Sequence, residues 1–346
     1  MSQEEITILD PLDAHLHLRN KKMLYDVALY TSSVFPRAVV FGNFTENPID
    51  DAPSSISYRD EIKAVDKNFQ PIMSIMLTRK TTVEVIIAAY NAGVRNLKFI
   101  PGGASTGGAR GLDLPDLKSM ISLYSLVREL GMIASFHFEL TSTPEGRKIP
   151  KESQELAAIR YLDFLVREIP GLKIVVEHAS SYDMIEYVKA APANVVATLT
   201  AHHALLTFAD VCDANGKIID PLNYCKPIAK TLLDRWAVRQ AMVSGNPKFF
   251  FGSDSAPHLL ELKRSANPPA GIFTAPVALP LLCQIFEEEK ALDKLEGFVS
   301  KYGADFYGLP GSQGIVTIKK EPWRVPIILA GIPIFMGGQR MQWKVM

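Results

Sequence analysis

Eight short apolar runs recur along the chain, and each is followed by a longer segment with the mixed polar and apolar spacing of a helix. The strand-like runs span residues 6–17, 37–41, 71–77, 94–100, 132–137, 172–178, 194–200 and 248–254. The helical segments span residues 23–31, 56–68, 83–92, 114–130, 152–168, 182–190, 228–244 and 276–288. Eight such alternations predict an α/β chain folded as a (β/α)8 TIM barrel, in which reactive residues lie at the carboxyl ends of the strands.

The length and composition are compatible with a single barrel. A chain of 346 residues with 47% hydrophobic content can bury a substantial core, although its length alone would also suit two ordinary domains. No repeat, low-complexity tract or linker divides the sequence, so we expect one domain over residues 1–346. After Leu309, apolar runs at 327–335 and 341–345 flank Gly337-Gly338 and predict an appended β-hairpin within residues 310–346.

The charge balance and the cysteines limit the classes of partner and compartment. The 37 basic and 37 acidic residues cancel, so we expect a small-molecule substrate and neither nucleic acid nor a membrane surface as partner. Cys212, Cys225 and Cys283 are odd in number and widely spaced, which argues against a disulfide framework and a cysteine zinc site and favours the cytoplasm. The acidic N-terminus does not read as a signal peptide, and no apolar run is long enough to span a bilayer.

Residues that can bind metal ions occur late in several of the predicted strands. His15 and His17 lie on one face of the first strand, because side chains alternate with period two, although two packed histidines would give the same pattern. His137 and His178 end later strands, and four histidines at one barrel mouth favour a metal site. Asp254 follows the last strand, where it either caps a helix or, near a metal, binds the ion and accepts a proton.

Lys98 also falls near the end of a predicted strand. A lysine chosen at random is usually exposed, but alternation along this strand points Lys98 into the histidine cluster. There an ammonium group would repel a divalent cation. Carbamylation by carbon dioxide would remove the conflict, because it converts the amine into an anionic bridging ligand.

The order His-x-His, strand-end Lys, His, His and Asp resembles the amidohydrolase superfamily, and the local sequence is similar to the shorter, bacterial-type dihydroorotases. The resemblance extends over nearly the whole chain, and Asp-Ser-Ala-Pro-His after a strand is its most specific motif. The matching segments are Leu16-His17-Leu18-Arg19, Glu177-His178, Gly252-Ser253-Asp254-Ser255-Ala256-Pro257-His258 and Phe306-Tyr307-Gly308-Leu309-Pro310.

This resemblance implies a zinc-dependent hydrolase of cyclic amides with two Zn²⁺ per subunit, bridged by N6-carboxylated Lys98 and by a hydroxide that acts as the nucleophile. One ion would be held by His15, His17, Lys98 and Asp254, and the other by Lys98, His137 and His178. Asp254 would be the general base and acid. The implied reaction is the reversible cyclisation of N-carbamoyl-L-aspartate to L-dihydroorotate with release of water, in de novo pyrimidine (UMP) biosynthesis. The implied assembly is a homodimer.

Further residues are expected to bind the substrate. Arg19 can form paired hydrogen bonds with a carboxylate, and the resemblance adds the side chains of Asn43 and His258 and the backbone of Lys226 and Ala270. The glycine-rich segment 102–110 is typical of a solvated linker loop; a phosphate loop is a weaker interpretation, because the segment lacks Gly-Lys-Ser/Thr. By resemblance it is a mobile lid that brings Ser105 and Thr106 to the substrate.

Some positions depart from the family pattern, and some alternatives stay open. Asn20, Gly42 and Phe138 replace the more usual Asp, Pro and Gly, whereas His202 and His203 have no assigned role. A hydantoinase or allantoinase would share the metal site, but Arg19, Asn43 and His258 favour an acidic substrate. A non-catalytic scaffold with this fold would need neither Lys98 nor Asp254.

Overall fold

Eight parallel strands form the centre of the molecule, and they follow one another around it in chain order. The computed structural model describes residues 4–104, 111–143, 145–311 and 314–346. The strands are β2 (Leu12–Leu16), β3 (Arg37–Val40), β4 (Gln70–Met76), β5 (Asn96–Phe99), β6 (Ile133–Phe136), β7 (Lys173–Val176), β8 (Val195–Leu199) and β9 (Phe249–Phe251). The predicted barrel is therefore confirmed, and each of its strands overlaps a predicted run.

The first and last strands of the barrel, β2 and β9, meet along a seam. Beyond the end of β9, Asp254 donates its backbone N–H to the carbonyl of His15 at 2.8 Å, and His17 donates to the carbonyl of Ser255 at 2.9 Å. A parallel bridge between Leu16 and Ser255 continues this contact. The seam therefore brings the chain around residue 15 next to the chain around residue 254.

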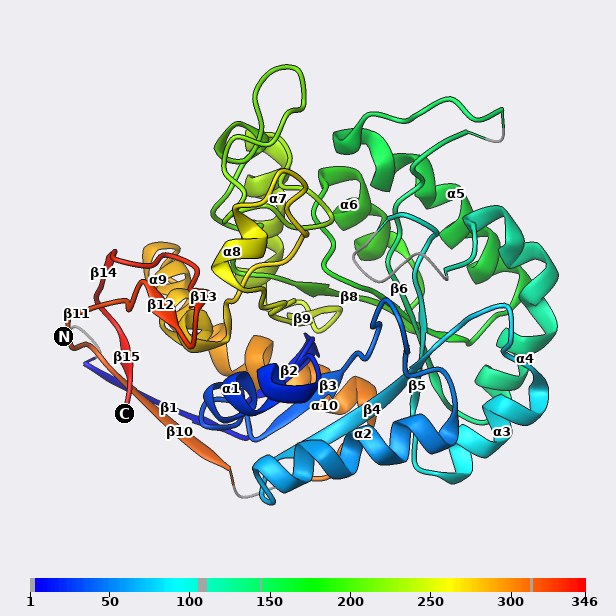
Figure 1. Cartoon of the computed structure of the whole chain (residues 1–346), viewed down its shortest axis with the longest axis horizontal. Helices are drawn as coiled ribbons and strands as arrows, with labels where there is room; N and C mark the ends of the chain where they lie inside the picture. Colours follow the sequence, from blue (N-terminus) through cyan, green and yellow to red (C-terminus); the bar gives the residue numbers. More distant parts are fainter. Residues whose placement is uncertain (1–3, 105–110, 144, 312–313) are drawn as a thin grey trace.

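Among the described residues, seven helices on the outside of the barrel connect its strands (Figure 1). They are α1 (Lys21–Ser32), α2 (Ala52–Val65), α3 (Val83–Asn91), α4 (Ile121–Glu129), α5 (Gln154–Glu168), α6 (Tyr182–Ala190) and α7 (Leu232–Val243). The last strand is followed by α8 (Leu260–Lys263), α9 (Ala278–Glu288) and α10 (Tyr302–Tyr307), of which α10 packs against the apolar cluster of the barrel interior. The predicted helix 114–130 begins as a 3₁₀ segment, Leu114–Met120, before it becomes α4. No helix within the described ranges is long and apolar enough to cross a membrane.

The predicted strand 6–17 is wrong as a single strand, because the chain turns at Asp10 with a φ of 48°. Its first part, β1 (Glu5–Leu9), leaves the barrel and pairs with β10 (Ile315–Lys319), which also pairs with β15 (Lys344–Val345). These three strands form a small antiparallel sheet at one side of the barrel (Figure 1). Only the second part, β2, belongs to the barrel.

The predicted C-terminal hairpin is confirmed. β12 (Ile328–Leu329) pairs with β13 (Ile332–Pro333), and β11 (Trp323–Arg324) pairs with β14 (Arg340–Met341), both antiparallel. Gly338, with a φ of 81°, lies in the turn region just before β14. That residues 1–346 form a single domain stays a prediction.

The alternation of side chains in the strands divides the core into two parts. Phe250 belongs to a small cluster that includes Leu12 and Val175 from other strands, as expected for the barrel interior. Phe251, the next residue, belongs to the larger core and stacks on Phe35 at 5.4 Å between ring centroids. The interior below the strand ends thus contains a cluster of packed apolar side chains, as expected for a barrel whose active site lies at the mouth.

Candidate active site

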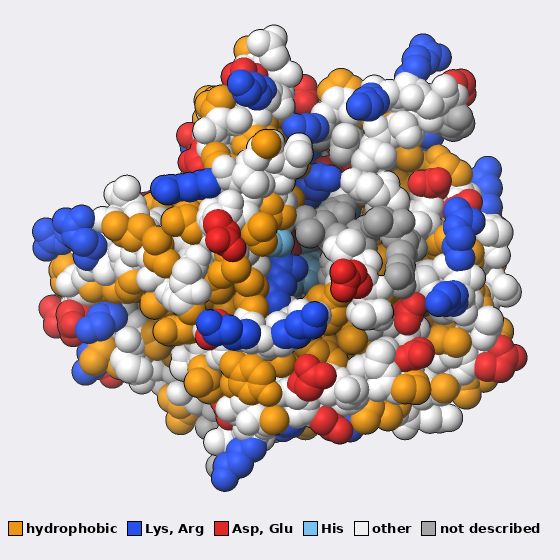
Figure 2. All heavy atoms as spheres, viewed as in Figure 1, with side chains coloured by type: hydrophobic (Ala, Val, Ile, Leu, Met, Phe, Trp, Pro, Cys, Tyr) orange, Lys and Arg blue, Asp and Glu red, His pale blue; other side chains and the backbone are white. Residues whose placement is uncertain are grey.

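A cavity lies at the carboxyl ends of the barrel strands. Figure 2 shows this hollow near the centre of one face, with basic and histidine side chains visible inside it. Ten of the residues singled out from the sequence line this cavity: His15, His17, Arg19, Asn43, Lys98, His137, His178, Lys226, Asp254 and Ala270. The fold therefore brings the predicted metal ligands and most of the predicted substrate contacts to one place.

The first set of donor atoms comes from the seam between β2 and β9. Nε2 of His15 lies 3.5 Å and Nε2 of His17 lies 3.4 Å from Oδ1 of Asp254. Ligand atoms about 2.0–2.1 Å from a tetrahedral zinc ion lie roughly 3.3 Å from each other. These three atoms therefore have the spacing of ligands that share one ion.

A second set of donors lies on the neighbouring strands β6 and β7. Nδ1 of His137 and Nε2 of His178 are 3.2 Å apart, which is again the spacing of two ligands on one ion. Lys98 lines the same cavity, and its buried Nζ has no hydrogen-bond partner among the described residues. A buried amine without a partner is costly unless something else satisfies it, so the donor set fits a carbamylated lysine between two cations.

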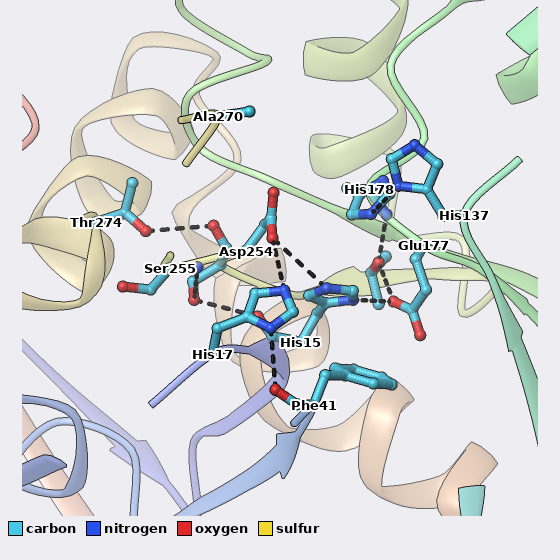
Figure 3. Close-up of polar contacts among 12 residues, drawn as sticks. His15, His17, Phe41, His137, Glu177, His178, Asp254, Ser255, Ala270 and Thr274 are labelled. Carbon is cyan, nitrogen blue, oxygen red and sulfur yellow. Dashed lines mark hydrogen bonds and ion pairs between the residues drawn. The ribbon is translucent and has the colours of Figure 1, made fainter. Parts of the chain in front are cut away.

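Acceptor groups behind the predicted ligands contact the opposite ring nitrogen of three of the four histidines, and Figure 3 shows those of His15 and His17. Nδ1 of His15 lies 2.7 Å from Oε2 of Glu177, and Nδ1 of His17 lies 3.0 Å from the carbonyl oxygen of Phe41. Nε2 of His137 lies 2.6 Å from Oε2 of Glu139. Acceptors of this kind fix the tautomer and the orientation of a metal-binding imidazole.

The surroundings favour the protonation states that metal binding requires. Burial lowers the pKa of His15 and of His178 well below the usual value, so their rings are neutral and keep a free lone pair. Burial also lowers the pKa of Lys98 to about 8, although Glu177 and Asp254 oppose the shift. Lys98 therefore has a much larger fraction of neutral amine at neutral pH than an exposed lysine, and the neutral amine is the form that reacts with carbon dioxide.

Asp254 remains ionised in this cluster. Burial raises the pKa of its carboxyl group, but the hydrogen bond with His17 and the neighbouring imidazoles lower it by more, so the net pKa is below the usual value. An ionised carboxylate can bind a cation and can also accept a proton. Asp254 is thus suited to both of the roles expected from the sequence.

The backbone is strained at two of the predicted ligands. His178 and Asp254 have φ values of 43° and 44°, in a region that non-glycine residues rarely occupy. Such conformations cost about 1–3 kcal/mol and tend to occur at functional sites. Gly252 permits the close approach of β9, because a Cβ there would lie 2.8 Å from Cβ of His15 and 2.9 Å from Cβ of Thr198.

Arg19 lies at one wall of the cavity and is held from two sides. Its Nε donates to the carbonyl of Pro257 at 2.9 Å, and its Nη2 lies 2.9 Å from Nε2 of His258. Nε2 of His258 also lies 3.0 Å from the carbonyl oxygen of Ala270. Burial lowers the pKa of Arg19 to about 10, so the guanidinium stays charged at neutral pH and can bind an anion.

The departures from the family pattern have local explanations. A Cβ at Gly42 would lie 2.2 Å from Cγ1 of Ile49, so this position is closely packed. Phe138 stacks on Phe136 at 4.8 Å and lies in the core, not in the cavity. Asn20 precedes α1 without a side-chain cap and borders a neighbouring groove. None of the three displaces a predicted ligand.

His202 and His203 do not line the cavity but form a second buried cluster with Cys225. The ring of His203 lies 2.8 Å from Oγ1 of Thr200 and 2.9 Å from the carbonyl oxygen of Pro227. Burial raises the pKa of Cys225 to about 12, so its thiol stays protonated. The contacts of His203 are those of a residue that fastens a loop.

The remaining site predictions have different outcomes. Ser105 and Thr106 lie outside the described residues, so their role in a lid stays a prediction. The sequence did not lead us to predict Glu139 or the role of Glu177 as an acceptor for a histidine ring. The available signal was a carboxylate close to a histidine at the end of an apolar strand, since Glu139 follows His137 by two residues and Glu177 directly precedes His178.

Comparison with known proteins agrees with this geometry, although no protein-family model matches the chain. A dihydroorotase from Marinomonas sp. (strain MWYL1) is 39% identical over 350 residues, which is 99% of each protein. The crystal structure of dihydroorotase from Saccharomyces cerevisiae in complex with 5-fluoroorotic acid is 30% identical, with a TM-score of 0.93 and 99% of both chains covered. The dihydroorotase structure from Campylobacter jejuni is 28% identical, with a TM-score of 0.84 over 99% of this chain and 97% of that one. The chain belongs to the dihydroorotase family of the amidohydrolase superfamily.

Proposed function

We propose that this protein is a zinc-dependent dihydroorotase, which interconverts N-carbamoyl-L-aspartate and L-dihydroorotate in de novo pyrimidine biosynthesis. The observation that carries the proposal is the pairing of two donor sets, around Asp254 and around His137, with the unpartnered Nζ of Lys98 in the same cavity. The charged Arg19 lies at the edge of this cavity and suits a substrate that carries a carboxylate.

Two zinc ions fit the donors present. His15, His17, Asp254 and a carboxylated Lys98 would hold one ion, and the same Lys98 with His137 and His178 would hold the other. Zinc ions at these positions would supply Lewis acidity, which activates water and polarises an amide carbonyl. Nitrogen and oxygen donors of this kind also accept cobalt or manganese, so metal analysis belongs to any test.

The residues of the chain then divide the work of the reaction. Arg19, with Asn43 and His258, binds the carboxylate and orients the ring, while Lys226 and Ala270 present backbone groups to the ring edge. Asp254 accepts a proton from the attacking water and delivers it to the amide nitrogen as the carbon–nitrogen bond breaks. In the biosynthetic direction the same carboxylate takes a proton from the carbamoyl nitrogen, and water is lost.

The test compares substrates on the zinc-loaded enzyme. The protein is purified, supplied with zinc and bicarbonate, analysed for bound metal, and assayed with dihydroorotate, hydantoin and allantoin. We expect two zinc ions per chain and turnover of dihydroorotate well above that of the two neutral rings, because only dihydroorotate carries a carboxylate for Arg19. Preference for hydantoin or allantoin would contradict the assignment, and an inactive protein would favour a scaffold role.

We also propose that the enzyme acts on this small molecule as a cytoplasmic homodimer, without nucleic acid or a membrane as partner. The support is the balanced charge of the chain, the three separated cysteines and the family resemblance. Light scattering of the purified protein tests the dimer, and a mass of one chain would contradict it.

A further inference from the structure

Lys263, the last residue of α8, is a buried lysine whose Nζ hydrogen bonds, within the described residues, go to backbone carbonyls. Its side chain is only 1% exposed, and its Nζ donates to three backbone carbonyls: Tyr224 at 3.0 Å, Pro269 at 3.1 Å and Gly271 at 2.7 Å. An ammonium group has three N–H donors, so all of them are used. Burial lowers the pKa of Lys263 to about 8, which reflects the cost of placing this charge in the interior.

The three acceptors belong to two chain segments that are far from each other in sequence. Tyr224 lies two residues before Lys226, whereas Pro269 and Gly271 flank Ala270. Lys226 and Ala270 both line the active-site cavity. Lys263 therefore joins the two backbone stretches that form one wall of the substrate site.

Other contacts show that this wall is tightly constrained. Gly271 donates its N–H to the carbonyl of Tyr224 at 2.9 Å, directly beside the lysine contacts. Gly271 has a φ of 140°, and a Cβ there would lie 2.5 Å from the carbonyl oxygen of Ala256. Lys263 is the charged group at the centre of this arrangement, and hydrogen bonds from charged donors are stronger than neutral ones.

A lysine that only capped the C-terminus of its own helix would donate to backbone carbonyls of that helix. None of the three acceptors of Lys263 belongs to α8, and the carbonyl of Tyr224 is 39 residues away in sequence. Lys248 is a useful comparison, because its Nζ also donates to three carbonyls, those of Val188, Lys189 and Ala191. Lys248 immediately precedes β9, and neither it nor its acceptors line the cavity.

We propose that Lys263 is a positioning residue, which fixes the backbone at Lys226 and Ala270 in the orientation that receives the amide edge of a cyclic substrate. The inference rests on the proposed function and adds to it a residue that does not touch the substrate. Because a correctly placed peptide edge binds the ring both before and during the reaction, its loss should act mainly on KM and less on kcat.

The experiment compares Lys263→Met with Lys248→Met in the zinc-loaded enzyme. For Lys263→Met we expect KM for dihydroorotate to rise by about 10- to 100-fold, with zinc content unchanged and kcat changed far less. For Lys248→Met, which also loses three carbonyl contacts, we expect an unchanged KM even if thermal stability falls. Lys263→Arg keeps charged N–H donors, so its KM should lie between those of the wild-type enzyme and Lys263→Met.

Two further comparisons keep the proposal testable. If Lys263→Met does not fold, Lys263→Gln is tested in its place. It keeps two N–H donors but loses the charge, so its KM should still be higher than that of the wild-type enzyme. An unchanged KM in a folded Lys263 variant, or an equal rise in Lys248→Met, would overturn the positioning role. A wild-type enzyme that binds zinc but does not turn over dihydroorotate would instead overturn the proposed function.

Discussion

The buried ion pair between Glu155 of α5 and Lys230 is the basis of a stability prediction. Oε2 of Glu155 lies 3.3 Å from Nζ of Lys230, and the two side chains are 2% and 0% exposed. The carboxylate also accepts the backbone N–H of Ser180 at 3.0 and 3.2 Å, and Nζ of Lys230 donates to Oγ of Ser180 at 2.6 Å. The pair thus fastens α5 to the chain after β7 and to the segment before α7.

Glu155→Ala should reduce the free energy of unfolding by about 3–5 kcal/mol, because it leaves the ammonium group of Lys230 buried without its counter-charge. Glu155→Leu combined with Lys230→Met should be less destabilising than Glu155→Ala, since the buried charge is then absent. The cost that remains is the unsatisfied N–H of Ser180, about 1–3 kcal/mol.

Urea unfolding of the zinc-loaded protein, followed by circular dichroism and tryptophan fluorescence, measures these differences. Asp163→Ala is the matched control, because Asp163 pairs with Arg167 at the surface, where the side chains are 45% and 67% exposed. We expect a change below about 1 kcal/mol for this control. A loss below about 1 kcal/mol for Glu155→Ala, or a double variant less stable than Glu155→Ala, would refute the reasoning.

Three further variants test the active site. Lys98→Ala should abolish most activity and reduce bound zinc, measured by metal analysis; normal zinc content with normal turnover would exclude a bridging carbamate. Glu177→Gln should weaken zinc binding by about 10- to 100-fold in a chelator competition, because the carboxylate that orients His15 is lost, and unchanged affinity would contradict this role. Arg19→Ala should raise KM for dihydroorotate by about 10- to 100-fold with a smaller effect on kcat, and an unchanged KM in steady-state assays would place the carboxylate elsewhere.

Much of the fold and of the candidate site followed from the sequence, because both depend on local periodicity. The alternation of strands and helices places His137 and Lys98 near strand ends, and parallel strands bring such ends together. The split of the first strand at Asp10 was not predictable in the same way. The segments on both sides of Asp10 are equally strand-like, and only pairing of β1 with β10, about 300 residues later, separates them.

The residues that support the site were harder to predict because their partners are distant in sequence or are backbone atoms. Glu177 contacts His15 across 162 positions, and no local pattern reports that distance. Among the described residues, Nζ of Lys263 donates to three backbone carbonyls, whose positions depend on the finished loops. Local pattern thus identifies the residues proposed to do the chemistry more readily than the residues that hold them in place.

The seam between β2 and β9 has a consequence for the order of assembly. His15 and His17 are made early in synthesis, and Asp254 is made 237 or more residues later, yet all three face one point where the first and last strands of the barrel meet. A growing chain that lacks the last strand would lack Asp254 and so one member of the first proposed zinc site. If zinc binds there as proposed, its tight uptake would report that the barrel has closed, and the bound ion would stabilise the closed barrel against reopening.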